Sequence, residues 1–74
     1  MSIEVELFGH LLPDAPRKQI LDTDASMLVR EVANMIGLNP EEPGLIVIDG
    51  VQSEMEDVVK SGSRICFFPY LSGG

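Results

Sequence analysis

The sequence has very few of the residues with which small proteins reinforce a fold by covalent bonds or metal ions. Its 74 residues include one cysteine, Cys66, and one histidine, His10. One cysteine cannot form a disulfide within the chain, and one Cys with one His cannot complete a four-ligand zinc site or a cysteine-ligated iron–sulfur cluster. We therefore expect no bound metal or cofactor, and a fold that depends on packing.

Basic residues are also scarce. Five Lys and Arg stand against twelve Asp and Glu, which gives a net charge of −7. Binding to phosphates or to an anionic membrane surface needs a basic face, so we expect neither nucleic acid nor a membrane as a partner. The sequence shows no signal-peptide pattern and no run near the roughly 20 apolar residues of a membrane span. These features predict a cytoplasmic protein.

The first part of the chain predicts a β-hairpin. Apolar and acidic residues alternate from Ile3 to Leu7, which is typical of a half-buried strand. Residues 9–16 include one glycine and two prolines and are expected to form a loop. Residues 17–21 are then predicted to return as the second strand.

A helix is predicted over residues 27–36. Ser26 is a suitable N-cap, and Gly37 is suited to the left-handed conformation that ends many helices. Four apolar residues recur at helical spacing and define the face expected to pack on the core. They are Leu28, Val32, Met35 and Ile36.

The middle of the chain predicts a second hairpin. Residues 45–48 are a continuous aliphatic run of strand length. Asp49-Gly50 follows, a dipeptide that favours a type I′ turn, and a return strand is expected from Val51.

Two more elements are predicted before the end of the chain. Residues 54–60 are expected to form a short helical turn with Met55, Val58 and Val59 against the core. Residues 64–68 are expected to form the last strand, which Pro69 ends because proline has no N–H to donate. The order of elements predicts an α+β fold, with a mixed sheet of four to five strands packed on one main helix.

The last ten residues differ in character from the rest. Although 23% of the chain is charged, residues 65–74 carry no charged side chain and include Phe67, Phe68 and Tyr70. Strand alternation turns Phe67 inward and Phe68 outward, onto the sheet face that is also expected to carry Phe8. An apolar cluster on a solvated sheet face is typical of a docking surface.

Three segments of the sequence resemble the small sulfur-carrier family called MoaD/ThiS. They are Ile48-Asp49-Gly50, Ser61-Gly62-Ser63-Arg64-Ile65 and Phe67-Phe68-Pro69-Tyr70-Leu71-Ser72-Gly73-Gly74. Members of that family have a ubiquitin-like β-grasp fold, and the ending of this chain is most similar to the molybdopterin-synthase small-subunit branch. The resemblance implies one β-grasp domain over residues 1–69 and a flexible diglycine tail over residues 70–74.

The resemblance also implies a function as a sulfur carrier. A ubiquitin-activating-type adenylating enzyme would use ATP to adenylate the carboxylate of Gly74, and sulfur would then displace AMP to leave a thiocarboxylate. A sulfur-acceptor enzyme, such as a molybdopterin-synthase large subunit, would receive the sulfur. The chain would thus be a substrate or small subunit of such enzymes and no enzyme by itself.

The resemblance implies distinct roles for the residues of the ending. Gly73 has no Cβ, so the backbone can approach a nucleotide closely inside a narrow channel. The residues expected to contact partner enzymes are Phe8, Phe68, Pro69, Tyr70, Leu71 and Ser72.

Two alternatives share the same fold and ending. The chain could be a ubiquitin-like modifier that is joined through Gly74 to lysines of other proteins. It could also carry sulfur for thiamine thiazole or for tRNA thiolation. Both alternatives keep the activation step and change the acceptor.

Overall fold

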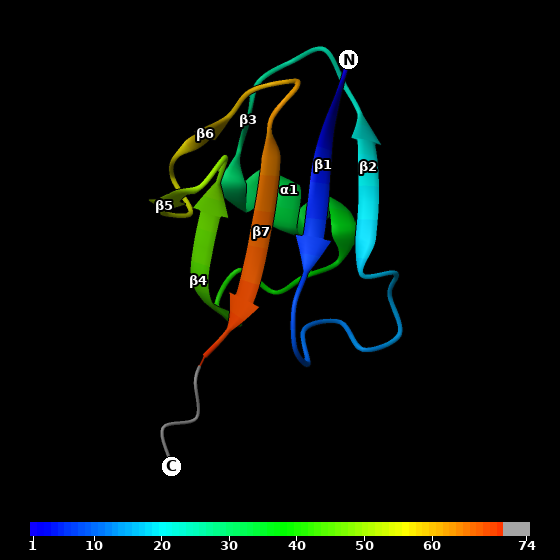
Figure 1. Cartoon of the computed structure of the whole chain (residues 1–74), viewed down its shortest axis with the longest axis vertical. Coiled ribbons are helices and arrows are strands. Elements are labelled where there is room, and N and C mark those ends of the chain that lie inside the picture. Colours follow the sequence, from blue (N-terminus) through cyan, green and yellow to red (C-terminus); the bar gives the residue numbers. More distant parts are fainter. Residues whose placement is uncertain (71–74) are drawn as a thin grey trace.

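The computed structural model describes residues 1–70 as a five-stranded sheet with one helix across it (Figure 1). The strands of the sheet are β1 (Ser2–Leu7), β2 (Lys18–Asp22), β4 (Pro43–Ile48), β5 (Val51–Ser53) and β7 (Arg64–Pro69). Their order is β2-β1-β7-β4-β5, with β1 and β7 parallel and the other neighbours antiparallel. The helix α1 (Val29–Ile36) lies on one face. This is the β-grasp arrangement that the sequence predicts.

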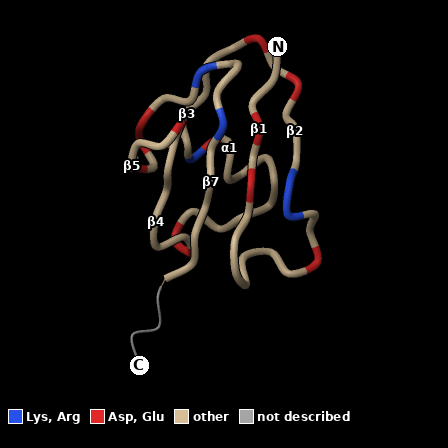
Figure 2. Tube along the Cα trace, viewed as in Figure 1, with Lys and Arg blue, Asp and Glu red and all other residues tan. Residues whose placement is uncertain are grey.

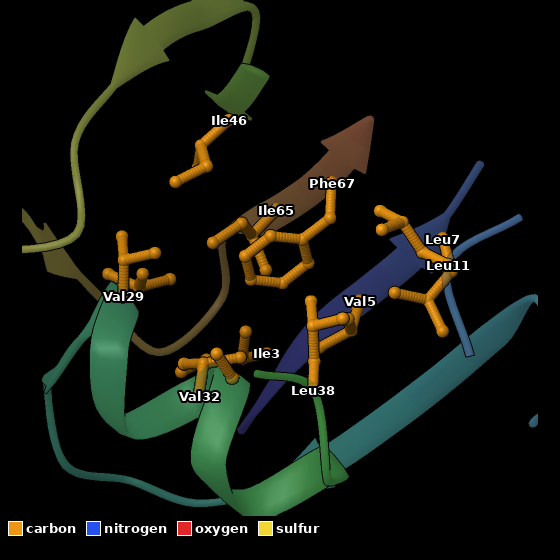
Figure 3. Packing of buried hydrophobic residues seen from close by; sticks show 12 residues of the cluster. Ile3, Val5, Leu7, Leu11, Val29, Val32, Leu38, Ile46, Ile65 and Phe67 are labelled. Atoms are coloured by element: carbon orange, nitrogen blue, oxygen red, sulfur yellow. The ribbon is translucent and has the colours of Figure 1, made fainter. Parts of the chain in front are cut away.

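The core lies between the sheet and α1. Alternation along β1 and β7 turns one set of side chains toward the helix, and Figure 3 shows these side chains meeting Val29 and Val32 of α1. Phe67 is fully buried at the centre of this layer. The buried residues of the sheet are Ile3, Val5, Leu7, Pro43, Ile46, Ile65 and Phe67. Two predictions are confirmed. The apolar residues of β1 face the core, and so does Phe67 of β7.

The helix begins two residues later than the sequence predicts. Met27–Leu28 forms strand β3, which pairs with β6 (Val58–Val59) in a separate two-stranded sheet. The first helical N–H groups are satisfied by backbone carbonyls of the segment before β6, with Val29 N donating to Asp57 O at 2.9 Å. Leu28 N donates to the Glu31 carboxylate at 2.9 Å. These partners replace the predicted Ser26 cap, so that prediction is wrong.

The buried face of the helix also differs from the prediction. Val29, Val32 and Ala33 are buried, whereas Met35 is 61% exposed. A helix that starts at Val29 puts its apolar stripe at positions i, i+3, i+4 and i+7, and Met35 lies outside that stripe. Gly37 ends the helix with φ +84°, as predicted.

Residues 54–60 form a turn and a short strand rather than the predicted helical turn. Asp57 N donates to Glu54 O at 3.1 Å and the Asp57 carboxylate accepts from Glu54 N at 2.7 Å, which closes the turn before β6. In β6 the side chains alternate, so Val59 is buried and Val58 is 52% exposed. The prediction that Val58 packs in the core is therefore wrong.

The two hairpins form as the sequence predicts, with small shifts of their ends. β1 and β2 pair antiparallel, and β2 begins and ends one residue later than expected. Asp49 and Gly50 both have positive φ, +48° and +83°, as a type I′ turn requires. Pro69 is the last residue of β7 and stands opposite Pro43. Neither proline has an N–H, so the β4–β7 ladder ends there.

The described residues contain one helix, and its eight residues are too few to cross a membrane.

Candidate functional site

The face of the sheet opposite the helix carries the aromatic pair that the sequence predicts. Phe8, just after β1, and Phe68 of β7 stack with ring centroids 4.4 Å apart and ring planes 10° apart. Leu45 stands across from Phe68 on β4, so its side chain joins the same face. Together with Pro69 and Tyr70 these residues form what we call the aromatic surface (Phe8, Leu45, Phe68, Pro69 and Tyr70).

The aromatic surface is hollowed where the described chain ends. A shallow depression of about 410 Å³ is lined almost wholly by apolar groups. Its lining residues are Gly44, Leu45, Phe68, Pro69 and Tyr70. Tyr70 is 68% exposed and also borders a second depression of about 230 Å³ on the far side of Gly44 and Leu45. The exposed side chain of Tyr70 therefore borders both depressions.

Two glycines allow the end of β7 to lie close to its neighbours. A Cβ on Gly44 would lie 2.7 Å from the Tyr70 Cα, and a Cβ on Gly9 would lie 2.6 Å from the Pro69 Cγ. Gly44 also sits at the irregularity in the β4–β7 register between Pro43 and Leu45. Both close approaches require residues without a Cβ.

Gly44 and Leu45 are site residues that the sequence does not predict. The Pro43-Gly44 dipeptide before an aliphatic strand is the one signal that could have marked a bulge. That dipeptide does not reveal that the backbone at Tyr70 passes over Gly44.

The loop between β1 and β2 supports the surface from one side. Figure 1 shows this loop at the same end of the sheet as the end of β7. The guanidinium of Arg17 donates to carbonyl oxygens of Gly9 at 3.0 Å, Leu11 at 2.6 Å and Ala15 at 3.2 Å, and also to Leu12. One side chain therefore ties the loop that holds Gly9 against Pro69.

Charged residues surround the aromatic surface without entering it. On the open face Arg64 pairs with Glu6, which precedes Phe8 by two residues. Glu41 and Glu42 precede Pro43, and Glu54 borders the second depression. Figure 2 shows acidic segments at several places around the sheet and few basic ones. The apolar patch therefore has a mainly acidic rim.

The carboxyl group of Asp49 has a lowered pKa. The backbone N–H of Arg64 donates to its carboxylate at 2.9 Å, and the Ser63 side chain adds a hydrogen bond. These two donors hold the pKa of Asp49 below its usual value of 3.8. Asp49 N in turn donates to Arg64 O at 2.9 Å, so the turn is tied to β7 from both sides.

Cys66 is half-buried on the open face. Its cross-strand neighbours are Glu6 of β1 and Val47 of β4. Across residues 1–70 no three His, Cys, Asp or Glu side chains gather in a metal-binding group.

The structure brings together four of the residues that the sequence assigns to partner binding. Phe8, Phe68, Pro69 and Tyr70 lie at one end of the open face. The other site residues predicted from the sequence lie outside the described residues. They are Leu71, Ser72, Gly73 and Gly74.

Comparison with solved structures supports the fold. No protein-family model matches the chain, and no curated protein matches it. The crystal structure of SAMP1 from Haloferax volcanii matches with a TM-score of 0.74 and 21% identity over 100% of both chains. The solution structure of the Haloferax volcanii HVO 2177 protein matches with a TM-score of 0.61 and 14% identity, over 100% of this chain and 87% of that one. Likeness at these identities establishes the β-grasp fold.

Proposed function

We propose that this chain is a sulfur carrier whose terminal group on Gly74 is loaded by one enzyme and unloaded by another. The proposal is supported by the position of the aromatic surface, because this surface includes Tyr70, the residue directly before the sequence Leu71-Ser72-Gly73-Gly74. That surface is apolar, lies opposite the helix and surrounds Tyr70, the last described residue. It offers a partner enzyme a docking area directly before the glycines.

The proposed chemistry has two steps. An oxygen of the Gly74 carboxylate attacks the α-phosphorus of ATP bound to an adenylating enzyme, and pyrophosphate leaves. A hydrosulfide then attacks the acyl carbon, the new C–S bond forms and AMP leaves. The product is a thiocarboxylate, a nucleophile that transfers sulfur to an acceptor molecule. ATP is bound by the partner enzyme, and this chain supplies the acyl group.

The described residues would contribute docking and direction. Phe8 and Phe68 offer a rigid stacked pair, which loses little side-chain entropy on binding. Gly44 and Gly9 leave room for the backbone at Tyr70 and the ring of Pro69. The acidic rim would speed association with a basic partner surface. We propose molybdopterin biosynthesis as the pathway, with a molybdopterin-synthase large subunit as acceptor, because of the resemblance of the last eight residues.

A ubiquitin-like modifier is the second candidate, because the same docking area and ending would serve it. In that function the adenylated Gly74 is passed to a lysine amine, and an isopeptide bond forms as the activating group leaves. The two functions share the first step and differ in the nucleophile. Lysine-linked adducts of the chain that survive thiol reductant would identify a modifier.

Genetic complementation tests the role of the ending. Gly73→Ala adds a Cβ next to the reacting residue, and a second variant extends the chain by several residues past Gly74. Both are expected to fold normally and to fail to restore a host that lacks the protein. Met35→Ala, at an exposed helix position, is the matched control and should complement. Complementation by an extended, untrimmed chain would overturn the proposal.

A further inference from the structure

Strand β2 forms one border of the sheet, and its outer edge has free hydrogen-bonding groups. Figure 1 shows no other element of the described chain beside this edge. Leu7 N donates to Arg17 O at 2.7 Å, which makes this pair hydrogen-bonded in the β1–β2 register. Hydrogen-bonded and non-hydrogen-bonded pairs alternate in an antiparallel ladder. The backbone groups of Gln19 and Leu21 therefore face β1, whereas those of Lys18, Ile20 and Asp22 face outward.

The side chains of these same three residues lie on the open face of the sheet and are exposed. Ile20 is 69% exposed, an unusual state for an isoleucine in the middle of a strand. Lys18 and Asp22 flank it symmetrically, two residues away on either side. Figure 2 shows a basic segment at one end of β2 and an acidic segment at the other.

This pattern is complementary to itself. When two β2 strands pair antiparallel about Ile20, each Ile20 stands opposite its equivalent, and Lys18 of each copy stands opposite Asp22 of the other. All three pairs use outward-facing backbone groups, so about six new hydrogen bonds can form. Two ion pairs then enclose a contact between two isoleucines, and opposite charges across a sheet stabilise pairing.

The pattern also selects one register. The nearest registers with the same outward groups are shifted by two residues and place Ile20 opposite a charged side chain. Many edge strands avoid association by carrying a lysine or a proline. Here the lysine has a matching acid at the symmetric position.

We propose that two copies of this chain associate through their β2 edges, centred on Ile20, to form one continuous ten-stranded sheet with two-fold symmetry. The aromatic surface lies on β4, β7 and the end of β1, so the pairing leaves it uncovered in both copies. The dimer presents two docking surfaces, and a partner with two sites gains affinity through the second contact.

Charge-swap variants studied by sedimentation equilibrium test the proposal. The measurements are made at about 0.15 M salt, because two copies of charge −7 repel each other at lower ionic strength. The unmodified chain is expected to show a monomer–dimer equilibrium. Lys18→Asp alone and Asp22→Lys alone each put like charges opposite each other twice and should weaken the dimer by at least about tenfold.

Two further samples make the test specific to this pairing. An equimolar mixture of the Lys18→Asp chain and the Asp22→Lys chain should form a heterodimer, because every cross-strand pair becomes complementary again. The double variant Lys18→Asp with Asp22→Lys should dimerise like the unmodified chain. Phe68→Asp, on the aromatic surface, should also leave dimerisation unchanged.

The outcomes separate this interface from any other. A chain that stays monomeric up to about 1 mM, the weak end of specific association, would overturn the proposal. So would a dimer that both single charge swaps leave intact, or one that Phe68→Asp abolishes. Circular dichroism spectra and melting temperatures like those of the unmodified chain would show that the variants fold, since all three exchanged positions are outside the core.

Discussion

The backbone at Tyr70 passes directly over Gly44: a Cβ on Gly44 would lie 2.7 Å from the Tyr70 Cα and 2.9 Å from its nitrogen. Gly44 thus determines how the chain leaves the sheet, before the residues that carry the proposed chemistry. The same pair separates the two depressions beside the aromatic surface.

Gly44→Ala should therefore move Tyr70 and reshape the surface. Overpacking at a backbone contact costs about 1–3 kcal/mol of folding free energy, and we expect weaker binding to the adenylating enzyme. Gly50→Ala is the matched control, because Gly50 has φ +83° and nothing within 4 Å of a Cβ. It should lower stability and leave the NMR resonances of Tyr70 and Leu45 in place. Unchanged resonances in Gly44→Ala would contradict this role.

The consecutive residues Phe67 and Phe68 should respond oppositely to truncation. Phe67 is fully buried, so Phe67→Ala should cost about 3–5 kcal/mol and leave a small domain largely unfolded. Phe68→Ala should remain folded and lose partner binding. A double-mutant cycle of Phe8→Ala and Phe68→Ala in urea unfolding should give a coupling of about 0.5–1.5 kcal/mol for the stacked rings. Equal destabilisation by the two truncations would show that Phe68 is part of the core.

Asp49 should make stability depend on pH in the acid range. Its folded-state pKa lies below 3.8, the usual value, because Arg64 N–H and the Ser63 side chain stabilise the carboxylate. The contribution to stability is complete above that value and is lost as the pH falls through the folded-state pKa. Asp49→Asn keeps a residue that tolerates positive φ and removes the charge.

Urea midpoints measured from about pH 6 down to about pH 2 check this prediction. The loss of stability at low pH should be smaller in Asp49→Asn than in the unmodified chain. Parallel curves for the two proteins would mean that the carboxylate adds nothing through its ionisation.

Arg17 should stabilise the loop beside Pro69 through its shape as well as its charge. Hydrogen bonds to a charged group are each worth about 1.5–3 kcal/mol, so Arg17→Ala should destabilise the domain by about 2 kcal/mol and speed amide exchange in residues 9–16. Arg17→Lys should recover little, because an ammonium cannot reproduce the planar fork that serves four carbonyls. Lys60→Ala, at an exposed site, is the control. Slow exchange in Arg17→Lys would contradict the geometric account.

Local patterns in the sequence predict much of this fold for a physical reason. The alternation in β1, the Asp49-Gly50 turn and Gly37 at the helix end depend on residues that are near one another in the chain. Each of these predictions is confirmed. The apolar surface around Phe68 was also predictable. Side chains alternate between the two faces of β7, so a buried Phe67 places Phe68 on the open face.

The features that the sequence does not predict depend on distant contacts. Met27 and Leu28 have helical spacing with later residues, but they pair with Val58 and Val59, about thirty residues away. The first turn of α1 takes its hydrogen-bond acceptors from the same distant segment, so a good N-cap at Ser26 is not needed. In the sequence Gly44 has no feature that distinguishes it from a loop glycine. Its role follows from the backbone of Tyr70, which lies against it in the structure.

The intact mass of the protein isolated from its native host shows whether Gly74 is chemically loaded. Exchange of one carboxylate oxygen for sulfur adds about 16 Da. We expect a population with that gain, which mild hydrolysis removes and which is absent from the Gly73→Ala variant. A mass equal to that of the unmodified chain, under conditions in which the pathway is active and hydrolysis is prevented, would contradict it.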